Sequence, residues 1–162
     1  VSMNHREAQQ IINQSAERGL GQGQGHCQEQ GQDGEQSQEQ NQGQRCGQAR
    51  EAGSVASLVA SLLGRSVVVR AGAAGAYFAR PAASANAAGV TYIPTPRVAA
   101  IDTNGAGDAH SGVLAAALAQ AIPLERALLL ANCAGALSTT LVGPAVCPAR
   151  EQIEAAADAL AD

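Results

Sequence analysis

The sequence contains no lysine, because all ten of its basic residues are arginines. A P-loop places a lysine on the nucleotide phosphates, and a protein kinase carries one on its third strand. Schiff-base chemistry also needs a lysine amine. The composition therefore excludes these three kinds of site before any motif is considered.

Paired metal-ligand motifs and long apolar runs are scarce as well. The four cysteines, Cys27, Cys46, Cys133 and Cys147, form no C-x-x-C pair, so we expect no zinc site. Cys133 and Cys147 stand in apolar surroundings, which is typical of buried thiols. No apolar run approaches the ~20 residues that a membrane helix needs.

The charge and the beginning of the chain bear on partners and location. A net charge of -4 gives no electrostatic footprint for nucleic acid, and no signal peptide is visible. We therefore expect a cytoplasmic protein with neither a membrane nor a nucleic-acid partner. The chain opens at Val1 inside what looks like a strand end, so we interpret it as truncated, which leaves organelle targeting open.

Composition divides the chain into three regions. Residues 1–18 predict the end of a strand followed by a short helix. Residues 19–50 are rich in Gln and Gly, with eleven Gln and eight Gly among the thirty residues from Gly19 to Gln48. So few apolar side chains do not offset the cost of ordering, about 1–2 kcal/mol per residue for the backbone. We predict a disordered insertion there rather than a coiled coil, and a globular part over 51–162.

The globular part alternates strand and helix patterns, which is typical of an α/β domain with helices packed on a sheet. The patterns rest on apolar periodicity, on β-branched runs and on Gly and Pro at the ends of elements. In chain order they predict a helix over 52–63, strands over 67–69, 76–79 and 90–93, and helices over 107–120, 123–140 and 150–160.

The strongest local motif runs from Asp102 to Asp108, with the sequence DTNGAGD. It follows a strand-like run and precedes a long alanine-rich helix. Small residues at Gly105, Ala106 and Gly107 leave the backbone N–H groups bare at the helix N-terminus, where the helix dipole favours an anion. An acid at Asp108 would then stand beside a bound phosphate, positioned to accept a proton.

Two other interpretations of this motif remain open. An Asp at a helix start is common as a cap, and glycines often mark plain turns. The motif also half-resembles the dinucleotide fingerprint G-x-G-x-x-G, but the sixth position is His110 and the acid about twenty residues on, Glu125, opens a helix. A dinucleotide-dependent oxidoreductase is therefore weakly supported.

The longer segment Asp102–Gly112, DTNGAGDAHSG, resembles the second signature of the ribokinase-like (PfkB) carbohydrate kinases, DTxGAGDxFxxG. The resemblance implies that Asp108 is the catalytic base and that the amides of Gly105, Ala106 and Gly107 hold the transferred phosphate. It also implies that Asp102, helped by the backbone of Asn104, binds a monovalent cation. His110 stands where the family usually has Phe, and a tolerated substitution is the simplest interpretation.

Two further segments resemble the nucleotide-binding parts of the same family. The run from Val67 to Ala76 is similar to a strand-turn-strand, V-x-T-x-G-x-x-G, in which Gly72 and Gly75 match and Arg70 replaces a frequent Thr. Asn132 resembles a helix residue near the adenine. Read without the family, the glycines mark a hairpin turn and the Asn is a satisfied packing residue.

The beginning and the end of the chain fit the same order of motifs. Asn4 and Glu7 resemble the N-x-x-E motif, which implies a magnesium ion organised largely through water. By itself N-x-x-E is common by chance, and His5 supports a metal-ligand interpretation equally well. The stretch 142–148 keeps the Gly/Pro character of the family's cation loop but has no serine.

Together these resemblances imply a three-layer α/β/α ribokinase-like domain that lacks the family's first half and its lid. They imply transfer of the γ-phosphoryl group of ATP to an alcohol group of a sugar. ATP and Mg²⁺ are the implied cofactors, with K⁺ as a further candidate, and a homodimer of the full-length parent is allowed. The alternatives are a non-catalytic nucleotide-binding or regulatory module derived from such a kinase, and an interaction protein built around the Gln/Gly tract.

Overall fold

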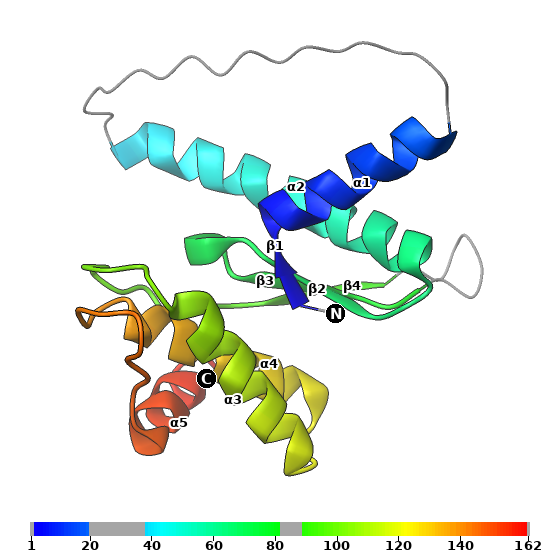
Figure 1. Ribbon diagram of the computed structural model, residues 1–162. Coiled ribbons are helices and arrows are strands. Elements are labelled where there is room, and N and C mark those ends of the chain that lie inside the picture. The colour runs from blue at the N-terminus through cyan, green and yellow to red at the C-terminus, as the bar shows by residue number, and fades with distance from the viewer. Residues whose placement is uncertain (1, 20–37, 82–88, 162) are drawn as a thin grey trace.

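The computed structural model describes residues 2–19, 38–81 and 89–161, and the side chains of these residues outside 16–50. Figure 1 shows the elements in their spatial arrangement. In chain order they are β1 (Ser2–Asn4), α1 (His5–Gly19), α2 (Gln38–Leu63), β2 (Val67–Arg70), the 3₁₀ turn η1 (Gly72–Ala74), β3 (Ala76–Ala79), β4 (Val90–Ile93), α3 (Ala106–Ala119), α4 (Leu124–Ser138) and α5 (Arg150–Asp158).

The four strands form one mixed sheet in the order β1-β2-β3-β4. β1 pairs with β2 in parallel, and Asn4 is in register with Arg70 at their shared carboxyl edge. β2, β3 and β4 then pair antiparallel, with Val68 opposite Phe78 and Ala76 opposite Ile93. The sheet therefore combines one crossover connection with two hairpin-type connections.

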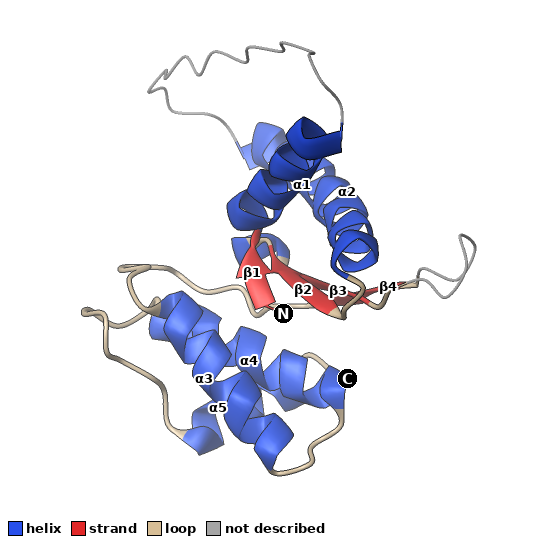
Figure 2. Cartoon of the chain, turned by 45° about the vertical axis from the view of Figure 1, so that its right-hand side comes forward, coloured by secondary structure: helices blue, strands red, loops and turns tan. Residues whose placement is uncertain are grey.

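Helices cover both faces of this sheet, which makes three layers. α1 and α2 cross over one face, while α3, α4 and α5 gather on the other (Figures 1 and 2). The predicted α/β/α architecture is thus confirmed. Within the described residues, no helix has both the length and the apolar character required to cross a membrane.

The side chains of β2 pack against both helix layers, because successive side chains in a strand point to opposite faces of the sheet. Val67 and Val69 are fully buried in the core shared with α1 and α2. Val68 points the other way and packs with Phe78 and with Leu128 of α4. A fully apolar strand is what a sheet covered on both faces requires.

The second helix begins well before the start predicted from its apolar stripe. The stripe over 52–63 packs on the sheet, and Val55 and Val59 are buried there. The structure also places residues 38–50 in α2, although their Gln/Gly composition predicted disorder. Adding residues to an existing helix costs far less than nucleating one, and Gln and Glu are adequate helix formers. Residues 20–37 lie outside the described part of the chain.

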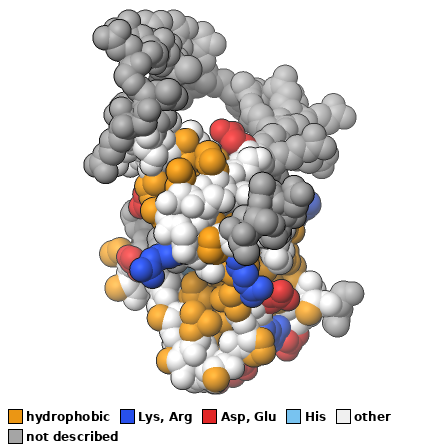
Figure 3. All heavy atoms as spheres, turned by 90° about the vertical axis from the view of Figure 1, so that its right-hand side faces the viewer, with side chains coloured by type: hydrophobic (Ala, Val, Ile, Leu, Met, Phe, Trp, Pro, Cys, Tyr) orange, Lys and Arg blue, Asp and Glu red, His pale blue; other side chains and the backbone are white. Residues whose placement is uncertain are grey.

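Several large apolar side chains remain at the surface. Leu58 and Leu62 lie one turn apart on α2, and Tyr92 is half exposed on β4. Figure 3 shows hydrophobic side chains coming to the surface over much of one side of the molecule. Cys133 is buried as predicted, but the prediction for Cys147 is wrong, because the loop that carries it leaves it exposed.

Candidate functional site

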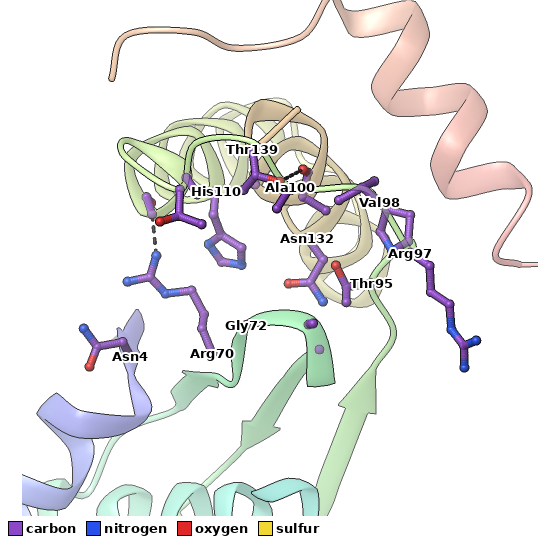
Figure 4. Close-up of a pocket in the computed structure, with 18 residues that line it drawn as sticks. Asn4, Arg70, Gly72, Thr95, Arg97, Val98, Ala100, His110, Asn132 and Thr139 are labelled. Atoms are coloured by element: carbon purple, nitrogen blue, oxygen red, sulfur yellow. Dashed lines mark hydrogen bonds between the residues drawn. The ribbon is translucent and has the colours of Figure 1, made fainter. Parts of the chain in front are cut away.

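A cleft of about 550 Å³ lies between the carboxyl edge of the sheet and the helices α3 and α4. Asn4 and Arg70 line it from the ends of the parallel strands, and η1 lines it from the turn that follows. Ligands of α/β proteins bind at this edge, because the loops that follow the strands converge there. Figure 4 shows the side chains that converge on the cleft from these elements.

Helix α3 begins at the cleft without a side-chain cap. Its N-cap residue is Gly105, in the left-handed conformation with φ 77°, and no side chain hydrogen-bonds to the first turn. A Cβ atom at Gly105 would lie 1.9 Å from the carbonyl oxygen of Pro144. Glycine is therefore required here both by the backbone angle and by the close approach of the loop at 142–148.

The amide groups of this turn are partly engaged within the turn itself. The Asp108 amide donates to the Gly105 oxygen at 3.0 Å, and the Ala106 amide makes a long bond of 3.4 Å to the Thr103 oxygen. Ala106 and Gly107 line the cleft, whereas Gly105 and Asp108 border it from outside its lining. The Asp108 side chain is exposed, and no described cation lies within 4 Å of its carboxylate.

Asp102 joins the two loops behind the α3 terminus. One carboxylate oxygen accepts a hydrogen bond from the Asn104 amide at 2.9 Å, and the other accepts from the Gly143 amide at 3.0 Å. The bond from Asn104, followed by the bond from Gly143, holds the pKa of Asp102 below its usual value of 3.8. Asp102 thus lies away from the cleft lining, beside the loop that the sequence assigned to cation binding.

Asn4 and Glu7 form a reciprocal cap at the start of α1. The Glu7 carboxylate accepts from the Asn4 amide at 2.8 Å, and the Asn4 side-chain oxygen accepts from the Glu7 amide at 2.8 Å. This is a capping box, which satisfies two backbone donors that the first turn would otherwise leave unpaired. The N-x-x-E spacing is a signal for such a cap as well as for the metal motif predicted from the sequence.

The predicted nucleotide contacts divide into turn and helix residues. Gly72 lines the cleft from η1 and Gly75 from the position just after it, and a Cβ atom at Gly75 would approach the Ile93 oxygen to 2.6 Å. Asn132 of α4 is 6% exposed. Its amide nitrogen donates to the backbone oxygens of Ile93 and Pro94 at 3.0 and 2.9 Å. Asn132 therefore ties α4 to the end of β4 while its side chain faces the cleft.

Arg70 extends from the end of β2 toward the first turn of α3, as Figure 4 shows. Its Nη1 atom donates to the Gly107 oxygen at 3.1 Å, and its Nε atom is buried without a hydrogen-bond partner. A Cβ atom at Gly107 would lie 2.8 Å from Nη1. The guanidinium therefore lies directly against the backbone of the glycine turn.

His110 enters the same space from α3. It is 3% exposed, and neither ring nitrogen has a hydrogen-bond partner. Burial, followed by the charge of Arg70, lowers the pKa of His110 to about 4, against a smaller opposite effect of the nearby Asn132 side chain. His110 is consequently neutral at physiological pH. Its closeness to Arg70 joins positions 40 residues apart and carries no signal in the local sequence.

Among the described residues there is no group of three or more His, Cys, Asp or Glu side chains arranged to hold a metal ion. The predicted site residues fall into two groups according to whether they line the cleft. Asn4, Gly72, Gly75, Ala106, Gly107 and Asn132 line it, while Glu7, Asp102, Asn104, Gly105 and Asp108 stand behind or beside the lining.

An uncapped helix N-terminus of small residues at the carboxyl edge of an α/β sheet is the arrangement by which proteins of this class receive phosphate groups. The family model of the pfkB family carbohydrate kinases matches residues 41–151, which is more than half of the chain. The chain belongs to this family, as the DTNGAGD motif predicted.

Solved structures of the same fold support this assignment. A ribokinase from Thermotoga maritima is 32% identical, with a TM-score of 0.54, over 64% of this chain and 33% of its own. A putative ribokinase from Agrobacterium tumefaciens is 26% identical, with a TM-score of 0.59, over 72% and 39%. Phosphofructokinase-2 from Escherichia coli matches 100% of this chain and 41% of its own at 21% identity and a TM-score of 0.60, which shows the fold. The chain thus spans about a third to two fifths of the length of these proteins.

Proposed function

We propose that this chain carries the nucleotide-binding and catalytic part of a kinase that transfers the γ-phosphoryl group of ATP to an alcohol group of a sugar. The observation that supports it most directly is the α3 terminus, which opens on the cleft at Gly105 without a side-chain cap and carries Asp108 in its first turn. Family membership agrees with this chemistry. A putative ribokinase II from E. coli, 30% identical over 59% of this chain with a TM-score of 0.50, was solved with ATP and Mg²⁺.

Asp108 acts as the general base in this proposal. Its carboxylate is exposed beside the cleft, so an acceptor hydroxyl can reach it from solvent. As the hydroxyl oxygen attacks the phosphorus atom, Asp108 takes the proton and the bond to the leaving phosphate oxygen breaks. A positioned base of this kind contributes typically 10²–10⁴-fold to the rate.

The amides of Gly105, Ala106 and Gly107 stabilise the charge on the phosphoryl oxygens. Ala106 donates only a long internal bond of 3.4 Å, so little is lost when a phosphate oxygen replaces its partner. The Asp108 amide is less available, because it already donates to Gly105 at 3.0 Å. The oxyanion-type stabilisation is therefore centred on the amides before Asp108.

Magnesium fits this site as a hydrated ion. Asn4 lines the cleft, but the Asn4 and Glu7 side chains already accept each other's amide bonds, and carboxylate and amide oxygens have lone pairs left for water. A hard cation that keeps its waters suits such donors. Asn4 and Glu7 would hold the ion through its waters, and the ion would neutralise phosphate charge.

Potassium is the second cation of the proposal. Asp102 keeps its charge because the Asn104 and Gly143 amides stabilise the carboxylate, and a charged oxygen beside the backbone of Asn104 suits a monovalent cation. The E. coli phosphofructokinase-2 of the same fold was solved in complex with potassium. We keep Asp102 and Asn104 as the proposed ligands.

For the nucleotide we propose that Gly72 and Gly75 give close backbone access at η1 and that Asn132 borders the base. The amide nitrogen of Asn132 already donates to two backbone oxygens, so only the side-chain oxygen is available to bind the base. A nucleoside kinase from Burkholderia thailandensis with this fold was solved with inosine, so nucleosides belong among the acceptors to test.

A homodimer of the parent protein remains part of the proposal.

The test is Asp108→Asn in the longest expressed form of the protein, with ATP and a panel of sugars and nucleosides. The expected result is a loss of kcat of at least 10²-fold with ATP affinity changed less than threefold, because the variant keeps the shape but loses the base. Glu125→Gln is the matched control, since Glu125 is an exposed acid in the first turn of α4. It should leave kcat unchanged.

Unchanged turnover in Asp108→Asn would remove the base from the mechanism. A wild-type protein that binds ATP but phosphorylates nothing on the panel would favour the alternative of a non-catalytic nucleotide-binding or regulatory module.

A further inference from the structure

Arg70 carries a positive charge to a place where the chain itself offers no counter-charge. Its guanidinium lies against Gly107 in the first turn of α3, the positive end of the helix dipole. A cation is unfavourable at that end of a helix. No described carboxylate forms an ion pair with Arg70, and its Nε atom is buried without a partner.

The two acids of the turn that precedes and opens α3 do not form ion pairs with Arg70. Asp108 belongs to the same turn but is exposed and lies outside the cleft lining. Asp102 already accepts two amide bonds on the far side of the turn. Two sources of positive potential, the Arg70 side chain and the α3 terminus, therefore converge on one part of the cleft.

A second polar group in the same place also lacks a partner. Only 3% of the His110 surface is exposed, and both ring nitrogens are without hydrogen bonds. Its ring points from α3 into the space between Arg70 and Asn132 (Figure 4). Leaving the nitrogens of a buried imidazole without hydrogen bonds destabilises the folded chain. A ligand in the cleft would supply the missing partner.

We propose that Arg70 is a phosphate-binding residue of the cleft, which holds a phosphoryl oxygen against the N-terminus of α3, with His110 as a neutral hydrogen-bonding group behind it. This subsite takes the polyphosphate chain of a nucleotide. The inference rests on the proposed function for the identity of the ligand, but the charge and the unpaired atoms that carry it are observed directly in this chain.

The bond from Arg70 to Gly107 also has a structural interpretation, in which the arginine only fastens α3 to β2. The two interpretations predict different changes in the affinity for phosphate ligands. A fastening residue would change the stability of the fold and affect all ligands alike. A phosphate-binding residue would change affinity in proportion to the number of phosphates on the ligand.

The experiment titrates the full chain with inorganic tripolyphosphate, ATP, AMP and adenosine by calorimetry. In Arg70→Gln we expect affinity for tripolyphosphate and ATP to fall about 10–100-fold, because one charge-assisted contact is lost. Adenosine affinity should change less than twofold. Arg70→Lys keeps the charge without the planar fork and should lose less than Arg70→Gln. Arg65→Gln, an exposed arginine outside the cleft, is the charge-matched control.

The His110 ring supplies a second readout by NMR. A bound phosphate offsets the charge of Arg70, so tripolyphosphate should raise the pKa of His110 in the wild type and leave it unchanged in Arg70→Gln. Arg70 is the described charged group that acts on this ring, and Asn132 is its polar neighbour.

Equal tripolyphosphate affinity in Arg70→Gln and in the wild type would overturn the inference while leaving the kinase proposal intact. So would an equal loss for adenosine and ATP. If Arg70→Gln does not fold, the same comparison with Arg70→Lys decides the matter. A wild type that binds tripolyphosphate through Arg70 but not ATP would sink the proposed function and keep the subsite.

Discussion

Two helices begin at the cleft edge, and they begin in opposite ways. At α1 the Asn4 and Glu7 side chains bond each other's backbone amides, so the first turn is closed by the chain itself. At α3 the first turn starts at Gly105 with no side-chain cap, and Arg70 lies beside it. Both termini come from motifs with an acid three residues after the first named residue, Asn4-x-x-Glu7 and Gly105-x-x-Asp108.

The difference lies in the residue at the cap position. Asn has a side-chain oxygen that reaches the third amide of the helix, whereas Gly has none. A glycine start provides no side-chain acceptor, so the amides of the first turn bond only to backbone oxygens of the turn, as Ala106 and Asp108 do, or to a ligand or solvent. The same spacing therefore yields a helix end capped by its own side chains at α1 and a helix end without a side-chain cap at α3.

The sharpest way to break this contrast is Gly105→Ala, which we expect to destabilise the chain by about 4 kcal/mol. The added Cβ would lie 1.9 Å from the Pro144 oxygen, and the backbone angle of 77° adds strain for any side chain. Left-handed strain costs about 1–2 kcal/mol and overpacking about 1–3 kcal/mol. Urea unfolding followed by circular dichroism measures the change.

Two other glycines separate these contributions. Gly64 has a φ of 60° with nothing within 4 Å, so Gly64→Ala should lose only the strain, about 1 kcal/mol. Gly112 lies in α3 with open space around its Cβ position, so Gly112→Ala should gain about 0.5–1 kcal/mol. A Gly105→Ala variant as stable as Gly64→Ala would show that the loop at Pro144 moves aside easily.

The next largest effect concerns His110, which is the uncompensated group behind the α3 terminus. Its pKa is lowered from 6.5 to about 4 in the folded chain, so the unfolded chain takes up the proton first as pH falls. Stability is full above pH 6.5 and is lost progressively between pH 6.5 and 4, by up to about 3 kcal/mol. His110→Phe should remove this part of the pH dependence.

The measurement is the free energy of unfolding at several pH values for both chains. All other titrating groups are common to the two, so the difference between the curves isolates His110. Arg70→Gln should give an intermediate slope, because it removes the smaller of the two causes. Parallel curves for wild type and His110→Phe would mean that His110 is solvated or paired in the folded protein.

The smallest effect is expected at α1, where Asn4→Ala removes the capping side chain. The loss should be about 1 kcal/mol, the usual value for an N-cap. Thr103→Ala is the matched change at α3, since no side chain caps that helix, and it should stay within about 0.5 kcal/mol of wild type. Thermal unfolding of both variants tests the pair, and equal losses would contradict the contrast between the two helix ends.

Most of the layer structure could be predicted from local patterns. Val67–Val69 indicated a strand buried on both faces, and Pro123 marked the start of α4, because these signals depend on neighbours in sequence. The start of α2 at Gln38 could not be predicted in this way, since the helix continues outward from a half that packing stabilises.

The site was predictable only as far as its motif extends. The small residues at 105–107 indicated an anion-binding turn because they open a helix, whereas the strand-like run before them forms no strand, since β4 ends at Ile93. The bond from Arg70 to Gly107 and the bonds from Asn132 to Ile93 and Pro94 connect residues 37 to 39 positions apart. Such contacts depend on the tertiary fold, so single-sequence patterns hold no trace of them.

The parallel pairing of β1 with β2 has a consequence for how this gene can vary. Parallel neighbours require a crossover, and here the crossover runs through α1 and α2 on the face away from the cleft (Figures 1 and 2). The Gln- and Gly-rich residues between Gly19 and Gln38 fall inside that crossover in the sequence. Repeats can be gained or lost there, or a reporter inserted, while Asn4 keeps its alignment with Arg70, since closure entropy depends only weakly on length.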